Sequence, residues 1–570
     1  MDAKIKTKLA ELQKVFEQEE LRISQADPIA KMLLVALAHQ ANQIEQKIDT
    51  SVERLSALFC DQVIQNSNLY AQPAVSVVKI GNSKEYAPYR LDEKVSFTYK
   101  PTKCIYRPLF TSQIIPGELA AYYAGDTLVL PYQEPIKVQK ANTAPKGEIW
   151  LAYEAAGEVE TLEGVTLALN HPIHSSSGIW AEICDTIVPV HLALEEEVYG
   201  LHTNFRLIEY WKQHLIHQNL WLYRFGSSKS DKAIRKTEMP HWLPETFNPE
   251  ALTPLANHRY LWIKLYSDTG CSLPPATEII FNCIPVANYD TTSVKLSYSE
   301  PIQRLENEKT GTQFLDVVQD AELAEEYFIR DFDVTQYDNH RIREDILNLY
   351  RHYVDDYFAF VHNNALHDGA ILRTLRSAMV QVYDALEDCK PNKQTAFKGV
   401  YAIRHPHNNQ QPIAISYFVT HGARGNLLTK DALLTPSYVA VGEVTALVNA
   451  AGGRDKVTGT TTRRELAKFS VHSNDRLFTK IDFLQYGRME WLRAFGDDSL
   501  KFCKMDMEMG NLPVGNHIEK CLFMIFRINS ERLYEEAMET NFQEYLEINM
   551  EIRKSFGCEV RVRLVNIDNS

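Results

Sequence analysis

The chain has 570 residues, of which 45% are hydrophobic and 24% are charged, a balance typical of soluble globular proteins. A chain of this length is expected to hold several domains, because single cores rarely grow past about 250 to 300 residues. Its 74 acidic and 60 basic residues give a net charge of −14, so the protein repels phosphate backbones, which argues against nucleic acid as its main partner.

The cysteines and the N-terminus indicate a cytosolic protein. The nine cysteines are an odd number, lie far apart and never have the CxxC spacing of a metal or redox site, which favours reduced thiols. The first residues are charged and amphipathic and lack the apolar core of a signal peptide. No stretch approaches the roughly 18 uninterrupted apolar residues of a membrane span, so we expect any membrane association to come through partners.

Residues 1–70 predict a helical head made of three segments with apolar seams. Asp27 and Pro28 mark the start of the longest segment, and Thr50 or Ser51 caps the third. These seams could pack on one another and on the chain's own β domain, or on a partner that covers the exposed apolar surface. The seam residues include Ile5, Leu9, Leu12, Phe16, Leu33, Leu37, Ile44, Leu55 and Phe59.

Residues 71–230 predict a β-rich domain, because prolines punctuate short β-branched and aromatic runs. Within it, residues 204–225 are densely apolar and ambiguous between helix and strands. A polar loop then suggests a boundary between about 225 and 240. Residues 231–335 form a second β region, with a strand expected at 278–288.

The remaining chain predicts three further segments. Residues 336–390 have apolar spacings of three and four that predict a helical hairpin. Residues 391–470 predict a β-rich segment, in which the glycine-rich stretch 450–464 is interpreted as a mobile loop or hairpin tip. Residues 471–570 predict a compact α+β unit that ends on a strand at 559–565. The predicted fold class is therefore multidomain α+β, with an N-terminal helical bundle segment, β-rich central domains, a helical hairpin insertion and a C-terminal α+β unit.

Several short motifs could in principle form a metal, phosphate or catalytic site, but an ordinary structural role explains each of them better. His214 and His217 are three residues apart, but no third ligand is near them in the sequence. His405 and His407 lie in a stretch of turn-forming residues. Residues 422–425 and 450–464 combine glycine with basic residues without either phosphate-loop order, and no GxSxG sequence occurs. We therefore predict no catalytic, cofactor-binding or metal-binding residue and no enzymatic activity.

The acidic stretch 316–326 could offer oxygen ligands to a cation. It lacks the spacing and the glycine of a calcium loop. A charged surface that docks to a basic partner is the preferred functional interpretation.

Three blocks of sequence resemble the TssF family, the wedge proteins of the type VI secretion baseplate. The first is the succession of helical segments, Tyr70, Pro73 and a valine-rich strand at 74–80. The second is the stretch 279–288, which matches the family's strand with an Asn-Cys-x-Pro-Val-x-Asn core, followed by Glu-Pro-Ile at 300–302. The third is the end of the chain, where Gly-Asn-Leu-Pro at 510–513 partly matches a longer family motif before a strand, a helix and a strand. Residues 330–470 match nothing in the family, so the resemblance is to a distant branch.

The resemblance implies a structural wedge subunit without chemistry of its own. In such a subunit the seam residues of the head form an inter-subunit bundle with a TssG-like chain, and Asn282, Pro285 and Asn288 are fold determinants. TssK-like and TssE-like subunits and a second copy of the chain are the further implied partners, with the C-terminal unit as the candidate contact between copies. The complex would sit in the cytoplasm at the inner face of the inner membrane and support assembly of the contractile sheath.

Two other functions remain open at this point. The chain could instead be the wedge protein of a contractile phage or phage-tail-like particle, which also combines a helical head with a β-rich body. A hydrolytic enzyme hidden in the β-rich middle would need a deep pocket with two convergent carboxylates.

Overall fold

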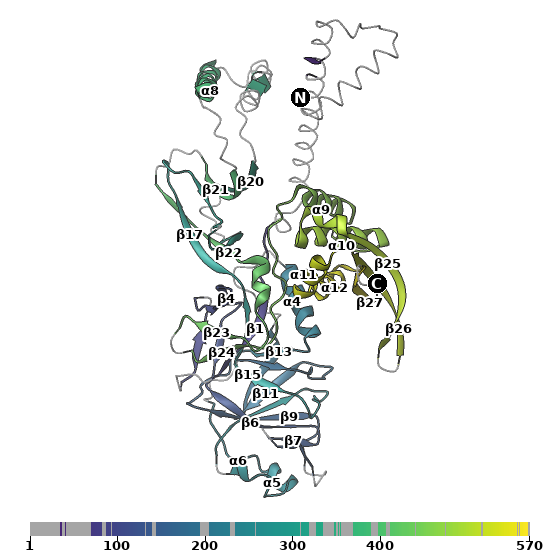
Figure 1. Cartoon of the computed structure of the whole chain (residues 1–570). Coiled ribbons are helices and arrows are strands. Elements are labelled where there is room, and N and C mark those ends of the chain that lie inside the picture. Colours follow the sequence, from purple (N-terminus) through teal and green to yellow (C-terminus); the bar gives the residue numbers. More distant parts are fainter. Residues whose placement is uncertain are drawn as a thin grey trace. The chain divides into compact units, whose positions relative to one another are not determined.

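The computed structural model of the chain forms two compact units, which are described separately (Figure 1). The first unit lies within Met1–Asp290 and Thr420–Ser570, and the second within Thr291–Val419. The residues described are 70–81, 87–130, 133–138, 144–193, 205–227, 234–318, 326–334, 369–388, 397–405, 411–438, 441–514 and 517–567, without 93, 257, 308, 474, 556 and 558, together with the isolated positions 35, 36, 40, 347, 348, 351, 352 and 354.

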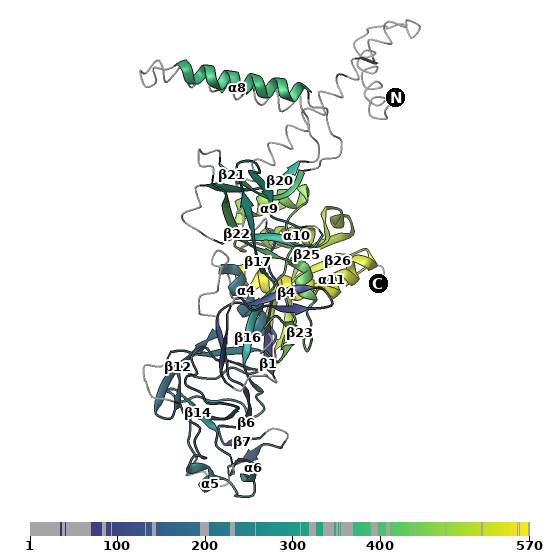
Figure 2. The ribbon, with the colours of Figure 1, turned by 90° about the vertical axis from the view of Figure 1, so that its left-hand side faces the viewer.

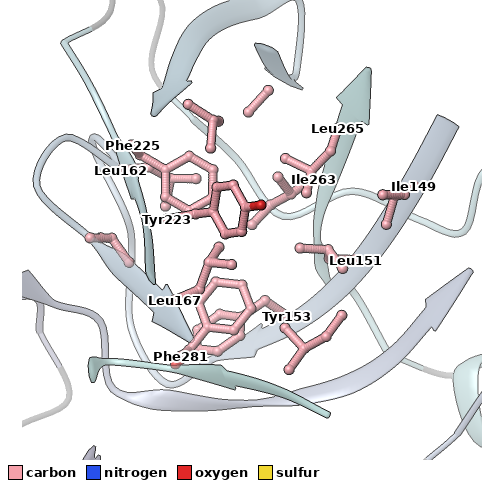
Figure 3. Packing of buried hydrophobic residues seen from close by; sticks show 14 of the residues in the cluster. Ile149, Leu151, Tyr153, Leu162, Leu167, Tyr223, Phe225, Ile263, Leu265 and Phe281 are labelled. Carbon is pink, nitrogen blue, oxygen red and sulfur yellow. The ribbon is translucent and has the colours of Figure 1, made fainter. Parts of the chain in front are cut away.

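A ten-stranded antiparallel sheet forms the largest part of the first unit. Successive side chains of a strand point to opposite faces, and one face of this sheet carries a continuous apolar core, which Figure 3 shows around Tyr153, Tyr223 and Phe281. In spatial order the strands are β15 (Ile279–Phe281), β10 (Thr166–Leu169), β13 (Trp221–Phe225), β12 (Thr186–Leu192), β11 (Ile179–Ile183), β14 (Leu261–Tyr266), β9 (Glu148–Ala155), β6 (Gly117–Ala124), β7 (Thr127–Val129) and β8 (Ile136–Lys137).

The other face of this sheet is partly covered by two short helices. Leu243 and Leu255 of the helices, and Phe247 and Leu252 of the segment that joins them, pack on β6, β9 and β14 as a separate apolar cluster. The helices are α5 (Trp242–Thr246) and α6 (Thr253–Ala256).

A closed six-stranded barrel adjoins the sheet in the first unit. All of its strand pairs are antiparallel, and Phe97, Tyr106 and Ile284 lie in its fully buried core. In order around the barrel the strands are β1 (Val75–Gly81), β16 (Cys283–Ala287), β4 (Cys104–Pro108), β3 (Phe97–Tyr99), β23 (Leu433–Pro436) and β24 (Glu443–Ala446). A two-stranded ribbon of β2 (Tyr89–Leu91) and β5 (Ser112–Ile114) and the 3-10 helix η2 (Gly422–Leu427) complete this part.

The C-terminal part of the first unit packs helices on one face of a three-stranded sheet (Figure 1). Trp491 of α10, Phe526 of β26 and Phe542 of α12 meet in its core. The Trp491 ring centroid lies 5.5 Å from that of Phe526 and 5.5 Å from that of Phe542. The α10 helix begins with a reciprocal capping box between Thr479 and Asp482. The elements are α9 (Thr460–Ser473), α10 (Lys480–Phe495), η3 (Asp497–Phe502), β25 (Cys503–Val514), β26 (His517–Ile528), α11 (Glu531–Glu539), α12 (Phe542–Arg553) and β27 (Glu559–Asn566).

In its described residues, the second unit contains two three-stranded sheets and a long helix. The sheets are β17-β22-β19, built from Asp290–Leu296, Ile413–Thr420 and Gln313–Val317, and β18-β21-β20, built from Ile302–Arg304, Phe397–Arg404 and Tyr327–Val334. The helix α8 (Gly369–Asp388) runs without a break, as Figure 2 shows, and confirms the second helix of the predicted hairpin. Most of the first predicted helix lies outside the described residues.

The α+β, multidomain fold class is confirmed, and the ambiguous stretch 204–225 becomes α4 (Phe205–His217) followed by β13. No sheet ends at the predicted 230/231 boundary, because β14 returns to pair with β9 and β11 of the first sheet. The expected strand at 278–288 is divided at Asn282 between the sheet and the barrel. The second unit takes in parts of three predicted segments, 231–335, 336–390 and 391–470.

The glycine-rich stretch 450–464 was expected to be a mobile loop or hairpin tip, and this expectation is wrong for its first half. Gly452, Gly453 and Arg454 are buried. A Cβ atom on Gly452, whose φ is +85°, would lie 2.7 Å from the Tyr210 ring, and one on Gly453 would lie 2.4 Å from a backbone oxygen. The glycines therefore allow close packing of the backbone, which sequence composition does not distinguish from mobility.

Candidate functional site

Asn282 stands where the chain passes from the ten-stranded sheet into the barrel. Its backbone is left-handed, with φ of 58°, a conformation that asparagine tolerates better than most residues. Its Oδ1 accepts a hydrogen bond from the backbone N–H of Ile115 (3.0 Å), and its Nδ2 donates to the Ile115 carbonyl (2.7 Å) and to the Tyr153 hydroxyl (3.2 Å). The side chain thus satisfies both backbone groups of Ile115 inside the protein.

Asn288 plays a comparable part at the other end of β16. It is completely buried, and its Nδ2 donates to the Ile105 carbonyl (2.8 Å). Its Oδ1 accepts from the Thr420 hydroxyl (3.1 Å) and from the backbone N–H of His421 (3.0 Å). Asn288 therefore ties together the two places where the chain leaves and re-enters the first unit. The side chains of both asparagines thus form hydrogen bonds inside the fold, and their role as fold determinants stays a prediction.

A buried polar joint around Arg454 connects the barrel to the C-terminal helices. Arg454 is 9% exposed and donates to Glu490 Oε1 (3.0 Å) and Asn549 Oδ1 (2.9 Å). The Tyr545 hydroxyl donates to the second oxygen of Glu490 (2.9 Å), and the Arg454 guanidinium lies 4.6 Å from the centre of the Tyr545 ring. Because the charges of Arg454 and Glu490 are removed from water, each depends on the other and on these hydrogen bonds.

Tyr70, the first residue of the continuous described structure, lies beside the same joint. Arg493 donates from NH2 to the Tyr70 carbonyl (3.1 Å). Burial, together with the nearby positive charge of Arg454, lowers the pKa of Arg493 to about 10. An arginine is thus desolvated at the point where residues 1–69 join the rest of the protein.

A second contact in this region joins α4 to α12. Nδ1 of His214 lies 3.2 Å from Glu544 Oε1, and its Nε2 lies 3.1 Å from the Asn449 carbonyl oxygen. Gln218 donates to the same Glu544 oxygen (3.0 Å), and Asn541 donates to the other. Burial raises the pKa of Glu544, but the hydrogen bonds and charge of these neighbours, His214 first, outweigh it and lower the pKa to about 2.

The predicted partner-binding residues are not among those that the structure describes. Ile5, Leu9, Leu12, Phe16, Leu33, Leu37, Ile44, Leu55 and Phe59 all lie outside the described residues. Of residues 1–69, only Val35, Ala36 and Gln40 are described, and they are helical and exposed. The Arg454 joint is not predicted by the sequence, because its residues come from distant parts of the chain and form no motif with a fixed spacing.

The other sequence candidates have structural roles or are separated. His214 is buried while His217 is exposed, so the pair does not converge, and no cluster of three potential metal ligands occurs among the described residues. The amide of Ala423, in the glycine stretch 422–425, already donates to the Asp455 carboxylate (3.0 Å), where a phosphate oxygen would have to bind. His407 and residues 319–325 of the acidic stretch lie outside the described structure.

A surface hollow of about 580 Å³ brings two carboxylates onto one face of β6 and β9. Glu118 lies directly opposite Glu154, and His258 and Lys236 line the same hollow. The side chains of Glu154 and His258 are 56% and 59% exposed. Water therefore surrounds these groups, and the hollow does not form the deep, desolvated pocket that the hydrolase hypothesis needs.

Comparisons with known proteins include a distant structural similarity. No protein-family model and no curated protein matches the chain. A search of solved structures found a chain of the type VI secretion system TssK-TssF-TssG baseplate subcomplex, determined by cryo-electron microscopy. The chain is distantly similar to that protein. The two are 11% identical with a TM-score of 0.39, over 94% of this chain and 96% of the other.

Proposed function

We propose that the protein is a structural wedge subunit of a type VI secretion baseplate, of the TssF kind, and that it works by assembly without chemistry of its own. The observation that supports this most directly is the stretch 279–288, which carries the resemblance to the TssF family. Asn282 and Asn288 each hold a junction of the chain through buried hydrogen bonds, so the resemblance rests on residues that determine the fold.

The proposed partners follow from the same resemblance. A TssG-like chain would cover the apolar seams of residues 1–65, and TssK-like and TssE-like subunits and a second copy of the chain would complete the wedge. The assembly would lie in the cytoplasm at the inner face of the inner membrane and support the contractile sheath. Among the described residues, the helices are all too short or too polar to cross a bilayer, and the proposed membrane link runs through partners.

Co-expression with the neighbouring genes tests the proposal. The full chain is affinity-purified, and the mass of whatever co-elutes is determined. We expect a stable complex with a TssG-like chain that is lost when residues 1–65 are deleted. A monomer that binds no neighbour would contradict the proposal, and neighbouring genes for capsid or fibre proteins would assign the chain to a phage-like particle instead.

A further inference from the structure

Among the described residues, nothing covers the outer face of the ten-stranded sheet over β12, β11 and the end of β14 near Tyr266. Residues directly opposite one another on neighbouring strands point to the same face, which gives two parallel rows. The first row is Pro189, Trp180, Tyr266 and Glu148, and the second is Ile187, Glu182, Lys264 and Trp150.

The opposite face of these same strands is the fully buried core. Ala181, Val188 and Leu265 lie between the residues of the two rows along their strands and are at most 1% exposed. The two rows therefore point away from the core. Trp180 is nevertheless 39% exposed and Ile187 is 49% exposed, so large apolar side chains meet water on a flat sheet face.

The helices α5 and α6 cover only one end of this face. Trp150 meets Trp242 of α5, with ring centroids 5.7 Å apart, and Trp262 is buried in the same cluster. Within the described part of the chain this apolar cluster includes neither Trp180 nor Ile187. The uncovered rows are thus continuous with the apolar surface that α5 and α6 cover.

The charges on the face are unequal. Lys264 is the single ammonium between two carboxylates in the two rows, 3.0 Å from Glu148 and 3.3 Å from Glu182. Its Nζ also lies 5.2 Å from the Tyr266 ring centroid. The two rows therefore keep one net negative charge, and Glu182 lies two residues from Trp180 on the same face of β11. An aromatic ring next to a carboxylate is suited to an arginine, whose planar guanidinium can stack on the ring and pair with the acid.

We propose that this face is a docking surface for a partner protein that presents an arginine flanked by apolar side chains. The arginine would stack on Trp180 and bond Glu182, while Ile187 and Pro189 receive the apolar neighbours. A polysaccharide is the less suitable occupant, because the Trp150 indole N–H already donates to Glu148 and the Lys264 ammonium lies over both the Trp150 and the Tyr266 ring, where a sugar would have to stack. Aromatic and arginine contacts of this kind dominate the affinity of protein interfaces.

The inference rests on the proposed function, because the probes are the baseplate subunits encoded beside this chain. Each purified neighbour is titrated with the wild-type full chain and with Trp180→Ala and Glu182→Arg. Tyr298→Ala, at a tyrosine in the second unit that is 73% exposed, is the matched control. Circular dichroism melting checks that all variants fold. Both test variants are expected to weaken binding to one neighbour roughly 30-fold, as loss of a central interface residue does, while the control binds as the wild type does.

The outcomes separate the two claims. Equal affinities for the wild type and both test variants would overturn the docking surface and leave the proposed function standing. A wild-type chain that binds none of the neighbours would overturn the proposed function and this inference with it. Retention of the wild type, but not of Trp180→Ala, by chitohexaose would assign the face to a polysaccharide and also overturn the inference.

Discussion

The side chain of Asn282 bonds both the N–H and the carbonyl of Ile115, at 3.0 and 2.7 Å, in the way that a neighbouring strand residue would. Asn282 is the single residue between β15 of the sheet and β16 of the barrel. The crossing from one sheet to the other therefore depends on one amide group, held in a left-handed backbone conformation.

Asn282→Ala is expected to destabilise the first unit by about 3 kcal/mol, because two buried backbone groups lose their partners and alanine disfavours the left-handed backbone. Asn282→Gly keeps the backbone freedom and loses only the hydrogen bonds, so its effect should be smaller. Urea unfolding measures both. Two variants as stable as the wild type would show that the amide does not hold the junction.

The sequence predicted this junction only in part. The family resemblance singled out Asn282 and Asn288 in the stretch 279–288, and the same resemblance implied the order of strand, helix and strand at the C-terminus, where the structure has two helices, α11 and α12, between β26 and β27. The return of β14 to the first sheet could not be predicted, because its partners β9 and β11 lie far away in sequence. The burial of Arg454 could not be predicted either, because it depends on Glu490 and Asn549 in distant helices.

Arg454→Met tests the buried polar joint. The substitution leaves Glu490, which is 2% exposed, without its ionic partner, and we expect a loss of about 3 to 5 kcal/mol in the free energy of unfolding. Lys501→Met removes a comparable pair with Asp498, but those side chains are 72% and 89% exposed. This control should cost under about 1 kcal/mol. Equal effects of the two substitutions in urea unfolding would contradict a desolvated joint.

Gly452→Ala tests why a glycine-rich stretch is buried. The new methyl group would have to displace the Tyr210 ring, 2.7 Å away, in addition to straining a backbone with φ of +85°. Gly125→Ala introduces similar strain, with φ of +67°, into open space. Calorimetry should show a cost of about 1 kcal/mol for the control, from backbone strain alone, and a larger cost for Gly452→Ala. A larger cost at Gly125 would indicate that position 452 is loosely packed.

Glu544 should make stability depend on pH in the acidic range. Its pKa is lowered from an ordinary value of 4.5 to about 2, so its contribution is present above pH 4.5 and is lost as the pH falls toward 2. The contribution is on the order of 3 kcal/mol. Urea midpoints measured between pH 2 and 6 should fall more steeply for the wild type than for Glu544→Gln. Parallel curves would mean that Glu544 is not held ionised at this contact.

The most direct test of the wedge proposal is the face of the helix predicted for residues 28–48. Leu33→Asp with Leu37→Asp places two charges in the predicted seam, and Asn42→Asp with Gln46→Asp places the same two charges on the opposite side of that helix. Each double variant is co-expressed with the TssG-like neighbour, and the mass of the purified complex is measured. The account predicts that the seam variant loses the neighbour and the control keeps it. A seam variant that assembles as well as the wild type would contradict the account.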